Sequence, residues 1–215
     1  MTALRYRVRS AGPWSRFRRL ALAVASIAAC ALFAAAKADA ADAAGAVEEL
    51  RGNAFADSSQ QHRALDRASP LYVGDRVSTG AASRLTMRLG TDTTIKLGEN
   101  TQLVIDKFLA DSGGEVTLES GPVLFDRPPG ARRIPMQIRS PYALIAVRGT
   151  QFFAGPSNGV FGVFVQNGTL EVSGAGSTVT LSVGQGTNLK APGAAPTPPV
   201  DWGQSRVDAA YASVR

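Results

Sequence analysis

The stretch SPYALIAVRGTQFF, residues 140–153, carries the strand signal around which the rest of the chain can be organised. A Ser-Pro corner opens it, five apolar residues follow from Ala143 to Val147, and two aromatic residues end it. An apolar run of this length between turn signals predicts a buried strand. Gly149 indicates a bulge or a close backbone approach at the break. Arg148 is a charge at the end of a run expected in the core, so we expect a carboxylate or a ring of carbonyls beside it.

Short strand signals recur from Leu71 onward at intervals of about ten residues, separated by Gly, Asn, Asp or Pro. The segment Arg84–Leu89 alternates between polar and apolar residues. This alternation predicts a half-buried strand with Leu85, Met87 and Leu89 on the core side.

Two polar segments interrupt the strand signals. Asp57–Ser69 is predicted to be a loop, with His62 exposed to solvent. Gln166-Asn167-Gly168 joins two apolar segments, and an Asn-Gly pair in that position is typical of a tight hairpin.

The C-terminal residues differ in composition from the strands. Ala191–Pro199 is rich in Pro and Ala and predicts an extended tail. Asp201–Arg215 is expected to form a short helix, with Trp202 as an anchor back onto the domain.

The sequence therefore predicts an all-β protein of about a dozen short strands, preceded by a helical signal peptide and followed by a short C-terminal helix. A β-solenoid or β-roll-like arrangement and two packed sheets both fit this pattern, although no strict repeat supports a solenoid. We divide the chain into a signal peptide at 1–40, an N-terminal strand and loop at 41–70, a β domain at 71–190 and a tail at 191–215.

The first forty residues have the pattern of an export signal. A basic head from Arg5 to Arg19 precedes an uncharged apolar run from Leu20 to Ala36, and small residues at 36, 38 and 40 offer cleavage sites. The apolar run is short for a membrane-spanning helix, which needs roughly 20 residues. We therefore expect an exported, periplasmic protein whose leader is cleaved at Ala38 or Ala40.

Two alternatives keep the chain at the membrane. Ile27-Ala28-Ala29-Cys30 resembles a lipobox, in which Cys30 would be lipidated, although the apolar run continues beyond it. A retained leader would instead be an N-terminal anchor. In both cases the membrane contact is made by the leader or its lipid.

The charge distribution argues against nucleic-acid binding. Residues 1–40 hold seven of the 23 Lys and Arg residues and one of the 17 acids, so the remainder carries 16 of each and has no net charge. No basic stripe is left there to neutralise phosphates. The chain has one cysteine, Cys30, and one histidine, His62, which excludes disulfides in the cleaved form and sites built from several Cys or His ligands. We expect no cofactor.

Six segments, in order, resemble the FecR domain family, a bacterial periplasmic module. They are GDRVSTG at 74–80, an alternating strand with its return at 83–97, ESGPV at 119–123, VRGTQF at 147–152, VFVQNGTLEV at 163–172 and LSVGQG at 181–186. The resemblance implies a β-rich fold in the periplasm. Founding members of the family are transmembrane regulators of sigma factors that sense an outer-membrane receptor. The chain departs from them, since only about 19 residues precede the apolar run and nothing after Leu189 matches a receptor-facing domain.

The candidate functional residues fall into two groups. Arg148, Gly149, Thr150 and Phe152 form the family signature and are expected to be structural. Arg127, Arg132 and Arg133 form the only concentrated positive spot after the leader and are the candidates to face a partner.

The leading hypothesis is a non-enzymatic protein-binding or scaffold module that contacts another protein of the cell envelope. The alternative is a periplasmic sensor that needs a separate membrane relay. A polysaccharide-active enzyme on a β-solenoid is a third hypothesis, but the acids are scattered and Trp202 is the only tryptophan after the leader. The sequence names no small-molecule ligand.

Overall fold

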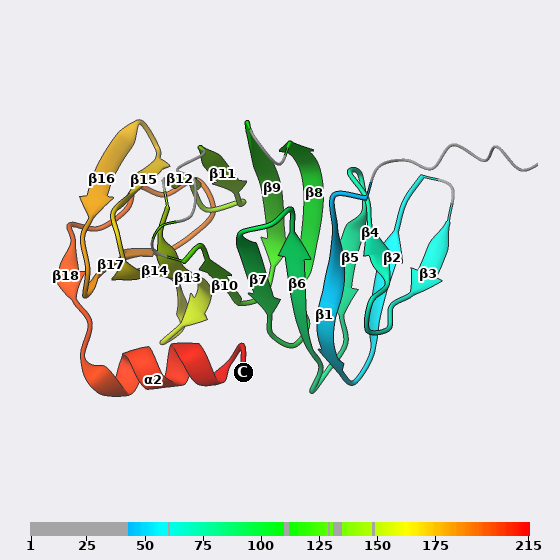
Figure 1. The fold of residues 1–215 in the computed structure, drawn as a ribbon. Coiled ribbons are helices and arrows are strands. Elements are labelled where there is room, and N and C mark those ends of the chain that lie inside the picture. Colours follow the sequence, from blue (N-terminus) through cyan, green and yellow to red (C-terminus); the bar gives the residue numbers. More distant parts are fainter. Residues whose placement is uncertain (1–42, 60, 110–111, 129, 131–134, 148) are drawn as a thin grey trace, which may run out of the picture. The chain divides into compact units, whose positions relative to one another are not determined.

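The computed structural model describes residues 43–59, 61–109, 112–128, 130, 135–147 and 149–215, which form two nine-stranded sheets and a short helix (Figure 1). In spatial order, sheet A contains β18 (Val200–Asp201), β17 (Gln185–Leu189), β14 (Val160–Asn167), β13 (Gln151–Ser157), β10 (Val123–Asp126), β7 (Thr93–Leu97), β6 (Arg84–Leu89), β1 (Gly45–Arg51) and β4 (Pro70–Leu71). Sheet B contains β16 (Ser177–Leu181), β15 (Leu170–Gly174), β12 (Leu144–Val147), β11 (Met136–Arg139), β9 (Gly113–Ser120), β8 (Gln102–Leu109), β5 (Arg76–Thr79), β2 (Ala54–Asp57) and β3 (His62–Ala64). The all-β prediction is confirmed, with two packed sheets rather than a closed barrel.

The chain changes sheet after almost every hairpin. The hairpins β6–β7 and β13–β14 belong to sheet A, whereas β8–β9, β11–β12 and β15–β16 belong to sheet B. Neighbouring strands are antiparallel, except that β9 and β11 run parallel because β10 separates them in the chain and lies in sheet A. The two sheets are therefore tied together by many short crossings.

The core lies between the sheets and receives every second side chain of most strands. In β6 the side chains of Leu85, Met87 and Leu89 are buried, as the alternation predicted. The same cluster takes Ile105 from β8 and Ile145 from β12 on the opposite sheet. Burial of one face of each sheet fixes the strand register, since a slip of one residue would turn the apolar side chains toward solvent.

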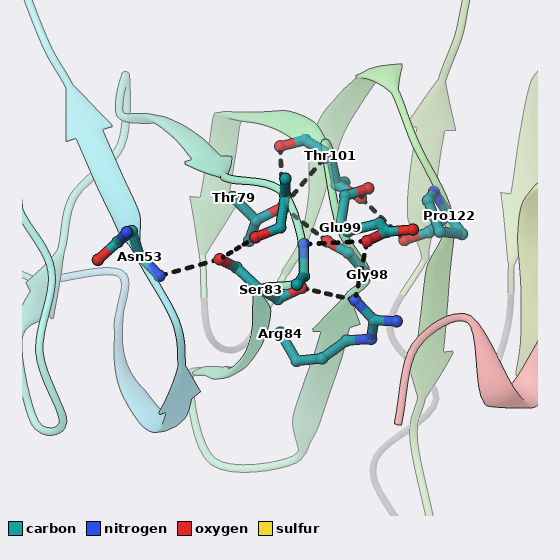
Figure 2. A network of polar contacts seen from close by, with 10 residues as sticks. Asn53, Thr79, Ser83, Arg84, Gly98, Glu99, Thr101 and Pro122 are labelled. Carbon is teal, nitrogen blue, oxygen red and sulfur yellow. Dashed lines mark hydrogen bonds and ion pairs between the residues drawn. The ribbon is translucent and has the colours of Figure 1, made fainter.

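Hydrogen bonds between neighbouring crossings hold the corners where the chain leaves one sheet for the other (Figure 2). The buried Thr79 hydroxyl donates to the Gly98 carbonyl oxygen at 2.6 Å and accepts the Thr101 backbone N–H at 3.0 Å. The Thr101 hydroxyl donates in turn to the carbonyl oxygen of Pro122 at 3.2 Å. A similar bond joins the earlier crossing, where the Asn53 N–H donates to Ser83 Oγ at 2.9 Å. We call this set of contacts the corner network.

Replacing Thr79 by valine should destabilise the fold. The shape is kept, but the buried Thr101 N–H and Gly98 carbonyl lose their shared partner, which costs about 1–3 kcal/mol of the free energy of unfolding. Urea denaturation of Thr79→Val measures this loss. The matched control is Thr91→Val, at an exposed turn position, which should unfold with the wild-type midpoint. Equal midpoints for the two variants would contradict the structural role of the corner network.

A second, smaller core covers the outer face of sheet A. Helix α2 (Gln204–Ala212) lies against this face (Figure 1). Its Tyr211 joins Trp202, Leu124, Phe153 and Phe164 in one apolar cluster. The predicted C-terminal helix and its tryptophan anchor are confirmed. No helix among the described residues has the length and apolar character needed to cross a membrane.

The indole of Trp202 packs directly against the backbone of two glycines. Its ring stacks on Phe164 with centroids 5.1 Å apart, and the guanidinium of Arg206 covers it at 3.6 Å from the ring centroid. A Cβ at Gly162 would lie 2.7 Å from the indole Cη2, and one at Gly186 would overlap the ring as well. Two strands of sheet A thus carry glycine where the indole needs contact with the backbone.

Removal of this anchor should loosen the C-terminal segment. Trp202→Ala is expected to lower the free energy of unfolding by about 3–5 kcal/mol, because a large buried side chain leaves a cavity. Thermal denaturation and limited proteolysis of α2 measure the effect. Gly162→Ala should destabilise the wild-type chain but have little effect in the Trp202→Ala background, where the new methyl group enters the cavity. If Gly162→Ala lowered the free energy of unfolding equally in both backgrounds, the proposed contact between the indole and Gly162 would be excluded.

One predicted hairpin is wrong. Asn167-Gly168 lies between β14 in sheet A and β15 in sheet B, so the pair forms a crossing rather than a hairpin. Only Gly168 has a positive φ, at 85°, whereas a type I′ turn needs two consecutive residues with positive φ. The β13–β14 hairpin instead turns at Asn158-Gly159, where φ is 52° and 79°.

Two other segments are more ordered than predicted. The expected loop at Asp57–Ser69 contains β3, in which His62 is exposed, stacks on Phe55 and contacts the Asp57 carboxylate. The Pro-rich segment after β17 has no strand of its own, yet the Thr197 carbonyl oxygen accepts a bond of 2.6 Å from Thr187 Oγ1. Both segments obtain their order from contacts with strands that local composition does not predict.

The strand count is also higher than a dozen, since several strands of two to four residues add to the expected set.

Candidate functional site

The signature segment forms one of the crossings between the sheets. Gly149 has a φ of +72°, a conformation that favours glycine, and the next residue, Thr150, is buried. Phe152 points into the main core, where its ring lies 5.3 Å from that of Phe125. The register of β13 with β14 shifts between Gln151 and Phe152, so a bulge, one of the two alternatives predicted at Gly149, lies two residues after it.

Two other segments pack closely on Thr150. A Cβ at Gly168 would lie 2.6 Å from Thr150 Cγ2. The crossing from β14 to β15 can therefore pass Thr150 only because residue 168 is glycine. The backbone N–H of Arg127 donates to the Thr150 carbonyl oxygen at 3.2 Å. The structure therefore brings together the signature and the start of the arginine-rich loop, which are 23 residues apart in the sequence.

Arg127 was expected to face a partner, but its side chain is only 4% exposed. Loss of water around the guanidinium lowers the pKa of Arg127, and the nearby Asp92 carboxylate opposes this effect. Sequence reasoning placed the residue in a solvated basic loop because it lies among Pro, Gly and Arg. The structure instead places it beside the crossing, where little of its surface is open to another molecule.

Four sequence candidates lie outside the described residues. Arg148 of the signature, Arg132 and Arg133 of the basic loop, and Cys30 of the leader belong to this group. The expected pairing of Arg148 with a carboxylate or carbonyl ring therefore stays a prediction.

Asp75 forms a buried lock that sequence reasoning did not identify. Its side chain is 2% exposed, and Oδ2 accepts a bond of 2.5 Å from Arg63 Nη2 and one of 2.9 Å from the Tyr72 N–H. The guanidinium of Arg63 also lies over the Tyr72 ring, 5.1 Å from its centroid. The sequence signal was the Gly-Asp pair at 74–75, but the arginine partner lies in the segment expected to be a loop.

Replacing Asp75 by asparagine should lower the free energy of unfolding by about 2 kcal/mol, because a hydrogen bond to a charged group is lost and the Arg63 guanidinium keeps no anionic partner there. Chemical denaturation measures the loss. The control is Asp66→Asn, at an exposed position nearby, which should leave the stability unchanged. If Asp75→Asn unfolded at the wild-type midpoint, the Asp75–Arg63 pair would make no contribution to the stability of the fold.

The fold and the signature can now be compared with known proteins. The FecR protein family matches residues 75–187, which is more than half of the chain. The chain belongs to the FecR family. No curated protein sequence matches it. Two crystal structures of a proposed anti-sigma factor from Parabacteroides distasonis share the fold, each with a TM-score of 0.50 and 19% sequence identity. The first alignment covers 62% of this chain and 63% of the other, and the second covers 62% of both, so the chain spans less than two thirds of that protein.

The acids of the FecR domain are distributed over the sheet faces, mostly beside arginines or hydrogen-bond donors. Arg76 makes two bonds of 2.8 Å to Glu119, and Arg139 contacts Glu115 on the outer face of sheet B. The bond to the glutamate is the main reason that the pKa of each arginine is raised. On sheet A, Arg88 pairs with Glu48. Other carboxylates are bonded to Thr117, Gln151 and the Ala82 N–H.

Open hollows lie on the surface of the part of the chain that the structure describes. One hollow, of about 620 Å³, lies between α2 and the ends of strands β13 and β14 and is lined by Gln151, Gln166, Gln204 and Arg215 among others. A hollow of about 360 Å³ lies beside the stacked rings of Tyr142 and Phe161, whose centroids are 4.5 Å apart. The described residues include no group of three or more His, Cys, Asp or Glu side chains arranged to hold a metal ion. Amides and aromatic rings in open hollows can make contacts with a protein surface.

Proposed function

We propose that this FecR-family protein is exported to the bacterial cell envelope and acts there, without catalysis, as a protein-binding or scaffold module. The observation that carries the proposal is the distribution of its carboxylates. Glu115 and Glu48 each neutralise an arginine on a neighbouring strand, and Glu119 neutralises Arg76 two strands away in sheet B. Asp75 does the same inside the fold. Carboxylates paired in this way belong to a polar surface and are not gathered into a catalytic group.

The same distribution argues against hydrolysis of polysaccharides. Glycoside hydrolysis needs two carboxyl groups on opposite sides of a substrate cleft, one of them with a raised pKa. In the described domain the acids lie along the sheets beside arginines or hydroxyl donors, and the hollows named above are not lined by a pair of carboxylates.

Export is supported by the charge pattern of residues 1–40, since the basic head and apolar run account for the whole net charge. The proposed location is the periplasm, after cleavage at Ala38 or Ala40. Lipidation at Cys30 or retention of the leader would keep the same domain outside the cytoplasm but attached to the membrane.

The partner contact is proposed to involve Arg132 and Arg133, which remain the sequence candidates for an anionic surface. Arg127 is not included, because its side chain is buried.

Expression of the tagged full chain in a Gram-negative host tests both parts of this proposal. Fractionation should find the chain in the periplasm with a new N-terminus after Ala38 or Ala40, as measured by mass spectrometry. Chemical cross-linking in the envelope should then yield a discrete complex with another protein. Arg132→Ala/Arg133→Ala should weaken this complex several-fold, since each lost charge–charge contact removes part of the binding energy.

The matched control is Arg51→Ala/Arg67→Ala, which removes two exposed arginines far from this loop in the sequence and should leave the complex intact. A chain retained in the cytoplasm would exclude the envelope role. Turnover of a cell-wall or polysaccharide substrate by the purified chain would exclude the non-enzymatic role.

Membership of the FecR family favours a second candidate, a sensor component of a signalling system. Such a sensor needs a membrane protein that relays the signal to the cytoplasm. The two functions differ in the partner that is cross-linked: a sensor should capture a membrane-spanning regulator and change transcription when deleted, whereas a scaffold should do neither.

A further inference from the structure

The ends of the two sheets are not equally protected against pairing with another strand. Three of the four end strands are very short, and each carries a proline or a charge: β4 begins with Pro70, β3 contains Arg63, and β18 ends at Asp201. Short length, proline and charge are the usual features that prevent edge strands from pairing with other chains. The fourth end strand, β16, has none of them.

Strand β16 is a five-residue segment, Ser-Thr-Val-Thr-Leu, without charge, proline or glycine. Among the described residues it pairs only with β15, and Ser177, Thr178 and Thr180 are exposed. Its residues have high β propensity, and one backbone edge is open to a further strand.

Apolar residues in β16 and near it are partly exposed to solvent at this end of the sheets. Val179 faces the main core but is only partly buried. Two of the three large exposed hydrophobic residues in the described part of the chain are also near this end: Val183 follows β16 with 61% exposure, and Val200 lies in β18 with 49% exposure. In Figure 1, β16 and β18 lie at the same end of the domain. A strand added to β16 would cover part of this surface.

The sequence of β16 is complementary to itself in one antiparallel register. When Val179 of one copy lies opposite Val179 of a second copy, Thr178 lies opposite Thr180, and Ser177 lies opposite Leu181. On the core side valine then meets valine at the centre, with serine opposite leucine on either side of it. Threonine meets threonine on the solvent side, and no charges are opposed. A two-fold axis through the centre of the pair requires this self-complementarity, because the same patch serves both copies.

We propose that two copies of this chain associate through β16 in this register, so that sheet B continues from one copy into the other. The interface is a single edge pair with an apolar fringe, and such small interfaces are weak. The association is therefore concentration-dependent. It does not depend on the proposed envelope role, since it is argued from β16 alone.

Charge exchange at the two outward threonines tests the proposal in the full chain. Thr178→Lys/Thr180→Lys places lysines opposite each other across the two-fold axis, and Thr178→Glu/Thr180→Glu does the same with glutamates. Sedimentation velocity from about 1 µM to about 500 µM should show a monomer–dimer equilibrium for the wild type. Each variant should remain monomeric, and an equimolar mixture of the two should form a heterodimer. Circular dichroism confirms that each variant is folded.

The matched control is Gln102→Lys/Gln137→Lys, which adds two exposed lysines to inner strands of the same sheet and should dimerise as the wild type does. A wild type that stays monomeric throughout, or that forms only large aggregates, overturns the proposal. Dimers of the Lys/Lys variant would place the interface elsewhere and overturn it as well. Neither result bears on the capture of an envelope protein, which is judged by its own experiment.

Cysteine cross-linking tests the register. Thr178→Cys and Thr180→Cys copies should form a disulfide with each other under mild oxidation and far less with themselves, because directly opposed residues in an antiparallel pair have the Cα separation that a disulfide requires. The unaltered chain controls for Cys30, its only natural cysteine. Equal self-linking and cross-linking would contradict the register centred on Val179.

Discussion

The hydrogen bonds of the Thr79 hydroxyl illustrate the constraint on which this fold depends. A chain that alternates between two sheets must leave its strand ladder at every crossing, and each crossing carries backbone groups that lose their ladder partners. Where a crossing is buried, such groups need another partner, because an unpaired buried N–H or carbonyl is costly. Thr79 supplies one to Gly98 and Thr101 at once. Satisfied corners therefore add to the stability that the packed core between the sheets provides.

The same requirement explains why the family motifs fall where they do. Ser140 at the start of the signature segment donates to the Ala143 carbonyl oxygen and accepts the Ala143 N–H at 3.0 Å, so it closes a turn with its own side chain. Thr150 and Gly168 allow two crossings to pass in contact. The residues of the family motifs are thus the ones that the geometry of the corners requires. They identify the fold, whereas partner contacts depend on surfaces that the motifs do not describe.

The sequence predicts the parts of the structure that depend on local patterns. Alternation in Arg84–Leu89 gave the correct core side, and the lone tryptophan after the leader gave the correct anchor for the C-terminal helix. Features that depend on distant segments were missed. Asn167-Gly168 has the composition of a hairpin, but both edges of β14 are occupied by β13 and β17, so the next strand must enter the other sheet. The Asp75–Arg63 lock and the burial of Arg127 likewise arise from contacts between separate segments.

The two outer faces of the domain are not equivalent, and the difference is visible in individual strands. In sheet A, β13 and β14 contain runs of four and five consecutive buried residues, because the main core takes one face and the α2 cluster takes the other. In sheet B, β11 alternates strictly between buried and exposed residues, so its outer face is polar. A protein that binds the outer face of sheet A near β13 and β14 must displace or accommodate α2. Sheet B can receive a partner on its face, or extend by a strand at β16, while its own packing is unchanged.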